Sequence, residues 1–522
     1  MKTKIFEISN KNDENISEVA ELLKKGEVVA LPTETVYGLC ANALNKKAVK
    51  KIFKAKKRPA DNPLIVHIAN KKSVEDLAYD IPKSAKKCMD RFWPGPFTVI
   101  LKKKPIVPSI TSGGLESVAI RLPANEIIRA VIEKSGLCLA APSANLSGSP
   151  SPTKASHVIN DMNKRIKGIV CSSDCEVGLE STVVSFLEEH PRLLRPGFVS
   201  AEELVEVIPD LIIDDGVLKS VEKALSPGMK YKHYAPKCEI TVINAKSKNF
   251  CDFVNEKNIP AICFKEEEKA LKVPFISLGD NPEQELFSAL RQLDEIKAKK
   301  AYAKAPHKNG VGLALYNRLI RAAGFKEFNL PIIVGLTGPS GVGKSTIAEY
   351  ASSLGFLNID CDKVAKEVVP TLKAELCKAF SDDILENGEI SNKKLASVAF
   401  KSKKATEKLN SITLPKIIEK IENIILESES NFILLDGATL IESGFNKKCS
   451  KIIAVLADDE LRLERFKNRD KLTKKEASLR LKAGKADSFY KENADFVIFN
   501  NGNKDELIKK AEEILISIKN PF

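Results

Sequence analysis

The sequence predicts an α/β protein. Short apolar strands alternate with amphipathic helices along most of the chain, which is the pattern of sheets covered by helices. The length of 522 residues suggests about three domains, at roughly 100 to 200 residues per domain. Hydrophobic residues make up 43% of the chain and charged residues 29%, so large apolar cores can form and a disordered chain is excluded.

The first expected domain covers residues 1–223 and begins with a helix, a tight turn and a buried strand. Apolar residues at helical spacing run over 16–25 and stop at Gly26, and residues 28–31 form an apolar strand. The same alternation predicts helices over 47–56, 82–92 and 125–135, and strands over 64–68, 97–101, 117–121 and 137–141. Loops rich in Gly, Pro and Ser follow over 141–153 and 171–182, and function is expected there.

The rest of the chain predicts a connector and two further α/β domains. Residues 224–237 hold two prolines, a glycine and two tyrosines without a helix or strand period, and are expected to connect domains. A small domain over 238–325 is indicated by strands over 240–243, 261–264 and 275–278 and by helices over 250–255 and 282–299. A third domain over 331–522 begins with the strand 332–336.

The charge balance favours phosphate-bearing partners. Lys and Arg number 82 against 69 Asp and Glu, a formal net charge of +13, and the first 104 residues hold 22 basic and 12 acidic residues. Such an excess suits nucleotides or RNA, and a solvated lysine-rich surface explains it equally well.

Cysteine usage and the N-terminal sequence indicate a reduced, cytoplasmic protein. The eleven cysteines are an odd number without CxxC pairs, so neither a disulfide scaffold nor a zinc site is expected. Residues 1–15 lack the apolar stretch of a signal peptide, and no apolar run approaches the roughly 18 residues of a membrane helix. No membrane partner is expected.

A phosphate-binding loop opens the third domain. Residues 338–345, GPSGVGKS, fit GxxxxGK[ST] and lie between an apolar strand and a helix over 346–353. Backbone N–H groups and the helix N-terminus suit phosphates, Lys344 neutralises β and γ oxygens, and Ser345 holds magnesium. The ATP-binding residues predicted here are Gly338, Gly341, Val342, Gly343, Lys344, Ser345 and Thr346.

Carboxylates and arginines follow the loop in the sequence. Asp360 ends the strand 357–360 and Asp362 lies just beyond it, where parallel sheets bind ligands, so one can orient Mg²⁺ and the other accept a hydroxyl proton. We assign Asp360, with Ser345, to the metal, and Asp436 after the strand 432–435 is expected beside the magnesium site, outside the set of direct ligands. A lid over the triphosphate is predicted from the helical spacing of Arg462, Arg465, Arg469 and Arg480, of which Arg469 is assigned to ATP, although solvated positions explain each equally well.

With these residues in place, the third domain resembles the dephospho-CoA kinases over about residues 331–519. The resemblance is carried by the phosphate loop, IDCD at 359–362, DGATLIE at 436–442, RFKNRD at 465–470 and ADFVIFNNG at 494–502. It implies a P-loop kinase with a parallel sheet and a lid that phosphorylates the ribose 3'-hydroxyl of dephospho-CoA with ATP. Asp362 is then the base, and Lys344 serves catalysis.

The third domain also departs from that family. Other residues are usual in the kinases at the positions of Lys366, Ser391, Asn392 and Leu414. Two alternatives therefore stay open, a domain that binds ATP without phosphorylating dephospho-CoA and a kinase for another small hydroxyl substrate.

Two clusters in the first domain suit a nucleotide. Lys56 and Arg58 precede a proline-stiffened turn that contains Asn62, and two cations there suit a triphosphate. The loop APSANLSG at 141–148 and the following PSPT at 150–153 are dense in hydroxyl and amide groups, which bond phosphate, ribose or magnesium without adding charge. Taken singly, Ser and Asn in such loops are more often turn formers.

Together with PTETVYGL at 32–39 and GLESTVV at 178–184, these clusters resemble the YrdC-like threonylcarbamoyl-AMP synthases. The long form of that family is matched by RPG at 195–197, the connector SPGMKYKHYAP at 226–236 and a GLGxAxxNR-like stretch at 310–318. The resemblance covers about residues 5–323. It implies a YrdC-like mixed-sheet domain followed by a small α/β C-terminal domain.

The resemblance also implies the reaction and its residues. L-threonine, bicarbonate and ATP give L-threonylcarbamoyl-AMP and pyrophosphate, and a tRNA-modification transferase complex later attaches the group to a tRNA adenosine. Threonine is expected at Thr35, His67, Arg121, Ala141 and Ser181. ATP is expected at Arg58, Asn62, Ser117, Ser143, Asn145, Ser151, Arg195 and Tyr231, with Lys56 and Arg58 as catalytic cations. No side chain stands out as a general base, and positioning of an already nucleophilic carbamate suffices.

A different class of function stays open for the first domain. The basic charge of residues 1–104 permits a module that binds tRNA or double-stranded RNA and does not use free threonine. Against this, the segment lacks interleaved aromatic residues for base stacking, and its hydroxyl-rich loops suit a small ligand.

Overall fold

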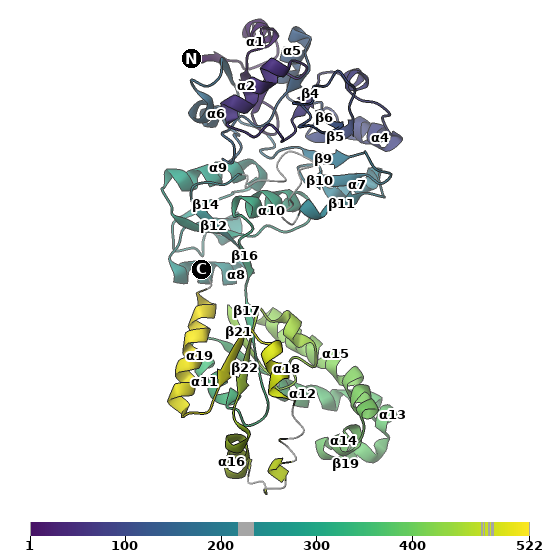
Figure 1. The fold of residues 1–522 in the computed structure, drawn as a ribbon, viewed down its shortest axis with the longest axis vertical. Helices are drawn as coiled ribbons and strands as arrows, with labels where there is room; N and C mark the ends of the chain where they lie inside the picture. Colours follow the sequence, from purple (N-terminus) through teal and green to yellow (C-terminus); the bar gives the residue numbers. More distant parts are fainter. Residues whose placement is uncertain are drawn as a thin grey trace. The chain divides into compact units, whose positions relative to one another are not determined.

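A computed structural model of the chain describes residues 2–217, 234–470, 473, 476–478, 481 and 485–520. The chain divides into two compact units, Met1–Phe328 and Asn329–Phe522 (Figure 1). Most of the predicted connector, residues 224–233, lies outside the described residues, and so does Tyr231. Among the described residues, no helix combines the length and the apolar character that crossing a membrane requires.

The first unit contains a mixed sheet of 11 strands with the order β1-β8-β2-β3-β7-β4-β6-β5-β9-β10-β11. Its strands are β1 (Lys4–Glu7), β2 (Val29–Leu31), β3 (Gly38–Asn42), β4 (Ile65–His67), β5 (Phe97–Lys102), β6 (Ser117–Arg121), β7 (Leu139–Ala140), β8 (Gly168–Cys171), β9 (Thr182–Ser185), β10 (Arg192–Arg195) and β11 (Ile212–Ile213). Neighbouring residues of β2 enter different apolar cores, Ala30 one and Val29 the other. Since side chains alternate along a strand, both faces of the sheet are covered.

Helices cover this sheet. They are α1 (Asn15–Lys24), α2 (Lys46–Lys56), α3 (Val74–Leu77), α4 (Lys83–Phe92), α5 (Glu126–Ser135), α6 (Ala155–Met162) and α7 (Ala201–Val207). Helices α1 and α5 lie side by side (Figure 1), with Val19 and Val131 in one core. Asn45 caps α2 by accepting from the N–H groups of Lys47 and Ala48, and the helix ends at Lys57 with a left-handed φ of 53°. The predicted pair Lys56 and Arg58 therefore lies at the end of a capped helix.

A second sheet completes the first unit, with the order β14-β13-β15-β12-β16. Its elements are β12 (Glu239–Asn244), α8 (Ser247–Lys257), β13 (Ala261–Cys263), β14 (Phe275–Ser277), α9 (Pro282–Glu295), β15 (Lys300–Lys304), α10 (Val311–Ala322) and β16 (Glu327–Asn329). Strands β12, β13, β14 and β15 pair in parallel. Val36 and Leu179, from loops of the first sheet, share a core with Leu286 and Leu315 of α9 and α10. The two sheets are thus packed together.

The second unit contains a parallel sheet of five strands with the order β18-β21-β17-β22-β23. Its strands are β17 (Ile332–Thr337), β18 (Leu357–Asp360), β21 (Phe432–Asp436), β22 (Lys451–Leu456) and β23 (Phe496–Phe499), and a hairpin is formed by β19 (Leu385–Glu386) and β20 (Glu389–Ile390). Its helices are α11 (Lys344–Ser353), α12 (Cys361–Val368), α13 (Lys373–Phe380), α14 (Asn392–Ala399), α15 (Lys403–Glu427), α16 (Asp459–Asp470), α18 (Asp487–Glu492) and α19 (Lys504–Lys519). Helices α11 and α19 lie side by side (Figure 1).

The predicted fold class is confirmed, with a mixed sheet, a small α/β sheet and a parallel sheet behind the phosphate loop. The predicted strand 117–121 coincides with β6, and the strand 357–360 with β18. The helix predicted over 282–299 is shorter, because α9 ends at Glu295. The domain boundaries predicted at 325 and 331 fall on either side of the division at Phe328 and Asn329.

Candidate active sites

A cavity in the first unit collects residues from seven separate parts of the sequence, between Thr33 and Tyr234. All five residues predicted for threonine line it, and so do three of those predicted for ATP: Thr35, His67, Arg121, Ala141 and Ser181, with Arg58, Ser143 and Arg195. Strand pairing explains the convergence. His67 on β4 is the register partner of Arg121 on β6, and Arg121 is in turn the partner of Thr98 on β5.

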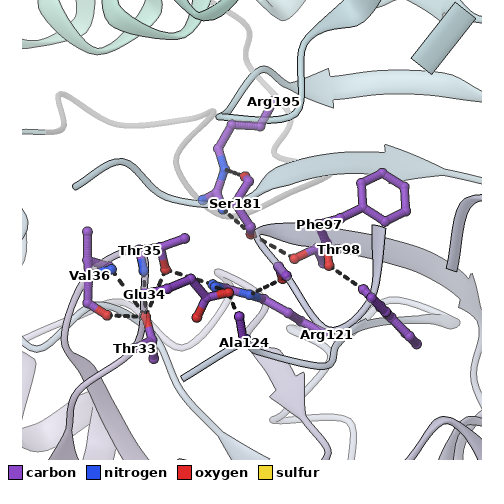
Figure 2. Close-up of polar contacts among 12 residues, drawn as sticks. Thr33, Glu34, Thr35, Val36, Phe97, Thr98, Arg121, Ala124, Ser181 and Arg195 are labelled. Carbon is purple, nitrogen blue, oxygen red and sulfur yellow. Dashed lines mark hydrogen bonds and ion pairs between the residues drawn. The ribbon is translucent and has the colours of Figure 1, made fainter. Parts of the chain in front are cut away.

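Arg121 is the centre of a buried polar network (Figure 2). Its Nη2 atom lies 2.7 Å from Oε1 of Glu34, its Nη1 donates to Oγ1 of Thr35 at 2.8 Å, and its Nε donates to the Gly95 carbonyl. Burial opposes ionisation of Glu34, but the Arg121 guanidinium and the Ala124 N–H outweigh it, so the pKa of Glu34 lies below its usual value. The guanidinium is therefore held rigidly at the wall of the cavity.

Ser181 links Thr98 on β5 to Arg195 on β10 at the cavity (Figure 2). Its Oγ lies 2.7 Å from Oγ1 of Thr98, and Arg195 donates to the Ser181 carbonyl at 3.0 Å and to its hydroxyl at 3.1 Å. Burial lowers the pKa of Arg195 to about 10, so the guanidinium stays charged at neutral pH. A second fixed cation therefore lines the cavity.

His67 is neutral. Burial first, and the Arg121 charge second, lower its pKa to about 3. Its Nδ1 lies 3.3 Å from the Ile65 carbonyl, which can only accept, so Nδ1 carries the proton in that hydrogen bond. The other ring nitrogen, Nε2, is then a hydrogen-bond acceptor.

Lys56 is buried beneath the loop 141–148. It is 1% exposed, and its ammonium donates to the carbonyls of Ser143 and Asn145 and, at 3.2 Å, to Oδ1 of Asn145. Burial lowers its pKa well below the usual lysine value. Three acceptors match the three protons of an ammonium, so the contacts of Lys56 position the loop.

The remaining residues predicted for ATP are not seen to line the cavity. Among the described residues of the first unit, four of them are absent from its lining: Asn62, Ser117, Asn145 and Ser151. Asn145 bonds Ser143 and Lys56, and Ser151 donates to Glu180 at 2.6 Å. Tyr231 falls outside the described residues.

Sequence reasoning missed Glu180 and Tyr234, which both line the cavity. Glu180 lies inside the GLESTVV motif, which was the available signal. Its role depends on Arg318, which is distant in the sequence. Nε of Arg318 lies 3.0 Å from Oε2 of Glu180, and Arg318 also donates to the Pro196 carbonyl. Burial raises the pKa of Glu180, but the charges of Arg318 and Arg195 reverse the effect and hold that pKa below its usual value. A helix of the C-terminal domain thus fixes a carboxylate of the cavity.

The phosphate loop of the second unit has the backbone that its motif requires. Gly338 has a φ of 135°, and a Cβ atom there would lie 2.1 Å from the Val455 carbonyl oxygen, so only glycine fits. Gly341 and Gly343 also have positive φ values, 84° and 100°. Lys344 donates to the carbonyls of Gly338 and Pro339, at 2.8 and 3.2 Å.

Arg462 and Arg465 support the loop from outside. On α16, Arg462 donates to the Ser340 carbonyl at 3.2 Å and Arg465 to the Gly341 carbonyl at 3.1 Å, while Asn500 donates to the Val342 carbonyl at 2.7 Å. These two arginines were predicted to close over a triphosphate, but in the structure they hold the loop carbonyls. The side chain of Arg469 and the whole of Arg480 lie outside the described residues.

Three carboxylates gather at the ends of neighbouring strands beside this loop. Asp360 on β18 is the register partner of Asp436 on β21, and Asp360 caps α12 by accepting from the N–H of Asp362 at 3.0 Å. Burial raises the pKa of Asp436 to about 6, with Lys344 lowering it and Asp360 and Asp362 raising it further. The carboxylates are therefore close enough to repel one another beside the loop lysine.

A cavity on the other side of the loop was not predicted. It is lined by loop residues and by three amide side chains: Gly341, Gly343, Thr346, Asn468, Asn500 and Asn503. Amides donate and accept hydrogen bonds, which suits the edge of a nucleobase. The NNGN run at 500–503 was the available signal.

Three family models match consecutive parts of the chain. The model described as telomere recombination, for the Sua5, YciO and YrdC proteins, matches residues 21–197. The model of the threonylcarbamoyl-AMP synthase C-terminal domain matches residues 199–324, and the dephospho-CoA kinase model matches residues 332–506.

Curated relatives divide in the same way. The chain is 45% identical over 326 residues to a threonylcarbamoyl-AMP synthase of Bacillus subtilis, covering 60% of this chain and 94% of the relative. It is 36% identical over 190 residues to a dephospho-CoA kinase of Fusobacterium nucleatum, covering 36% of this chain and 98% of the relative.

A solved structure agrees with the first assignment. Sua5 of Pyrococcus abyssi, in a crystal structure described as complexed with L-threonine, is 41% identical with a TM-score of 0.59 over 63% of this chain and 99% of that chain. The chain therefore belongs to the threonylcarbamoyl-AMP synthase family in its first unit and to the dephospho-CoA kinase family in its second, and is a fused nucleotidyltransferase and phosphotransferase.

Proposed function

We propose that the first unit converts L-threonine, bicarbonate and ATP to L-threonylcarbamoyl-AMP and pyrophosphate, and that its cavity binds threonine. The observation that carries the proposal is the convergence of Thr35, His67, Arg121, Ala141 and Ser181 on one cavity. The Pyrococcus relative crystallised with L-threonine supports it.

Charge and hydrogen bonding suggest how threonine lies. The Arg121 guanidinium attracts the carboxylate, and the hydroxyls of Thr35 and Ser181 add hydrogen bonds. Nε2 of neutral His67 accepts from the threonine hydroxyl or amine. With a pKa of about 3, this imidazole is too weak a base to take a proton from an ammonium at neutral pH.

After threonine has bound and has been carboxylated to a carbamate, the carbamate attacks ATP. The amine of threonine and bicarbonate give an N-carboxylated amine and water. A carboxylate oxygen of this carbamate then bonds the α-phosphorus while the bond between the α-phosphorus and the leaving pyrophosphate breaks. Arg58 and Arg195 stabilise the charge that develops on the phosphoryl oxygens, and Lys56 holds the hydroxyl-rich loop under it. Positioning and fixed charge suffice, because the carbamate is already a nucleophile.

Pyrophosphate release by the purified full chain tests this assignment. Release should require L-threonine and bicarbonate together, and Arg121→Lys should raise KM for threonine because a lysine cannot form the bidentate pair. Threonine-independent RNA binding without pyrophosphate release would favour the rival RNA-binding function.

We propose that the second unit transfers the γ-phosphoryl group of ATP to the ribose 3'-hydroxyl of dephospho-CoA. Residues 338–345 cradle the phosphates, Lys344 neutralises them, and Asp362 accepts the hydroxyl proton. The amide-lined cavity beside Gly343 suits the adenine base of ATP.

The donor set beside the loop fits Mg²⁺. Asp360 and Asp436 end adjacent parallel strands, and Ser345 lies in the first turn of α11, next to Lys344, whose charge acts on Asp436, so these residues offer hard oxygen ligands. Bound there, Mg²⁺ neutralises phosphate charge. Asp362, in the first turn of α12, stays available for the hydroxyl proton.

Formation of CoA from dephospho-CoA and ATP tests the kinase. We expect activity with a raised KM for dephospho-CoA, because Lys366, Ser391, Asn392 and Leu414 replace residues usual in the family. Binding of ATP and magnesium without product at millimolar dephospho-CoA would establish the scaffold function instead.

The adenylate is reactive and must be consumed by a further enzyme. We propose that a tRNA-modifying transferase complex takes it up in the cytoplasm, where ATP and threonine are available. Direct contact of this chain with tRNA or double-stranded RNA is a separate hypothesis, which a filter-binding assay with tRNA tests.

A further inference from the structure

A second cavity in the first unit lies in the C-terminal domain, at the carboxyl ends of β13 and β15. Phe264 and Glu266, which follow β13, and Pro306 and His307, which follow β15, form part of its lining. The chain leaves β13 toward β14 on one side and leaves β15 toward β16 on the other. Adjacent parallel strands whose connections diverge in this way open a crevice, and open α/β sheets bind ligands there.

Lys304 lines this cavity from the end of β15 and is 7% exposed. Within the described part of the chain, its ammonium has neither a hydrogen bond nor an ion pair. The nearest buried carboxylate, Glu267, instead accepts from Oγ of Ser247 at 2.6 Å and from the N–H of Phe264 at 2.9 Å. Burial raises the pKa of the Glu267 carboxyl, and the charge of Lys304 acts to lower it without forming an ion pair with it, so all three protons of the ammonium can be donated to a bound anion.

The first turn of α10 also faces the cavity, through Val311 and Gly312. The loop before it is closely packed, because a Cβ atom on Gly312 would lie 2.1 Å from the His307 carbonyl oxygen. The N–H of Gly310 donates to Oε1 of Glu202 at 3.1 Å, and the N–H of Val311 has no partner among the described residues. An N–H at a helix N-terminus and an ammonium together suit a phosphate.

The outer part of the lining carries the opposite charge. Glu266 is exposed and Glu283, in the first turn of α9, is half-buried. Two carboxylates repel a di- or triphosphate, but they accept hydrogen bonds from hydroxyl groups. The lining therefore favours a molecule with one phosphate and several hydroxyls.

We propose that this cavity binds a phosphate monoester of a hydroxyl-bearing small molecule, that is, a sugar phosphate or a nucleoside monophosphate. The phosphate lies at Lys304 and the N–H of Val311, and the hydroxyls donate to Glu266 and Glu283. None of these residues lines the threonine cavity or the phosphate loop, so the site is additional to both reactions.

Hydrogen–deuterium exchange on the full chain tests the proposal, because it separates this site from the other phosphate-binding sites. Ribose 5-phosphate should protect residues 304–316 at a lower concentration than inorganic phosphate does. AMP then distinguishes a nucleoside monophosphate from a sugar phosphate. If AMP binds more tightly than ribose 5-phosphate, the base contributes to binding. Residues 338–346 serve as an internal control that responds to phosphate.

Lys304→Met should raise the concentration of ribose 5-phosphate for half-maximal protection by about tenfold or more, the usual loss for a hydrogen bond to a charged group. Lys300→Met, exposed at the start of the same strand, is the matched control and should leave the curve unchanged. If Lys304→Met disturbs folding, Val311→Pro removes the N–H at a helix position that tolerates proline and should also weaken protection, with Val311→Ala as the control for the lost side-chain packing. The proposal is overturned if residues 304–316 gain no protection while residues 338–346 do, or if both variants protect like the wild type.

Discussion

Arg318 and Glu180, 138 positions apart in the sequence, form a buried ion pair with 3.0 Å between Nε and Oε2. Arg318 is fully buried, and Glu180 also accepts from Ser151 at 2.6 Å. The pair therefore connects α10 of the C-terminal domain to two loops of the threonine cavity.

Arg318→Met should lower both the stability of the first unit and its synthase activity. Removal of one partner leaves the Glu180 carboxylate buried without its main counter-charge, which costs about 3 to 5 kcal/mol. Urea unfolding can be followed through the fluorescence of Trp93, the single tryptophan of the chain, which is buried in the first unit. Arg318→Lys should recover part of the stability and of KM for ATP. Full activity of Arg318→Met would contradict a positioning role.

Lys56→Ala and Arg58→Ala should both abolish threonine-dependent pyrophosphate release, for different reasons. Lys56 holds the loop 141–148 through buried hydrogen bonds, so its loss should also reduce stability by about 2 to 4 kcal/mol. Arg58 lines the cavity, so its loss should spare stability. Nucleotide binding by the second unit should survive in both variants, and its loss in a folded variant would refute separate sites.

The pKa of His67 predicts a pH dependence of stability. It is about 3 in the folded chain and about 6.5 for an unperturbed histidine, so the unfolded state binds more protons between these values. Stability of the first unit should rise with pH across that window and fall on acidification, by several kcal/mol in total. His67→Gln should flatten the slope measured by urea unfolding at Trp93, leaving a smaller slope from His157, whose pKa is about 4, and from Glu34 and Glu180, whose pKa values lie below the usual one. An unchanged slope would mean that His67 is not buried as described.

Lys344→Ala should remove ATP binding by the second unit, because the phosphates lose their cation. Asp362→Asn should instead lower kcat far more than ATP affinity. A raised KM for dephospho-CoA of about 5- to 150-fold is expected from missing acceptor contacts worth about 1 to 3 kcal/mol. Isothermal titration with ATP and a CoA-formation assay separate these effects, and equal losses in both for Asp362→Asn would contradict its role as base.

Deletion of Ser226–Pro236 should weaken the synthase through loss of Tyr231 and of Tyr234, which lines the cavity. The Tyr234 ring lies 5.2 Å from that of Phe287 on α9, so the segment is anchored to the C-terminal domain at its end. An unchanged kcat and KM for ATP would mean that the segment is only a tether.

Local pattern predicted the strands that carry the site, but not how they pair. The β4 and β6 strands were visible as apolar runs, whereas the pairing of His67 with Arg121 is set by contacts distant in sequence. For the same reason, the sequence did not show that Arg318 pairs with Glu180. The motif predicted that Lys56 belongs to the site, but not what it does there. Its charge suggests a phosphate ligand, whereas its burial indicates that it supports the loop 141–148.

The long helix α15 escaped prediction for a local reason. It contains Pro415, which normally ends a helix, and only a few of its side chains, such as Thr413 and Ile421, are buried. Apolar residues do recur at helical spacing over 417–425 and pack against the core, but the proline interrupts the pattern where it begins.

The ion pair of Arg318 with Glu180 determines where the chain can be divided. A fragment that stops before residue 238 would leave Glu180 without Arg318, its main counter-charge, and with only Arg195 to balance it, so such a fragment should express poorly. A cut after Asn329, the last residue of β16, leaves each sheet with all of its strands and helices. Gene fusion or fission, in nature or by engineering, is thus expected to preserve residues 1–329 as one inheritable block.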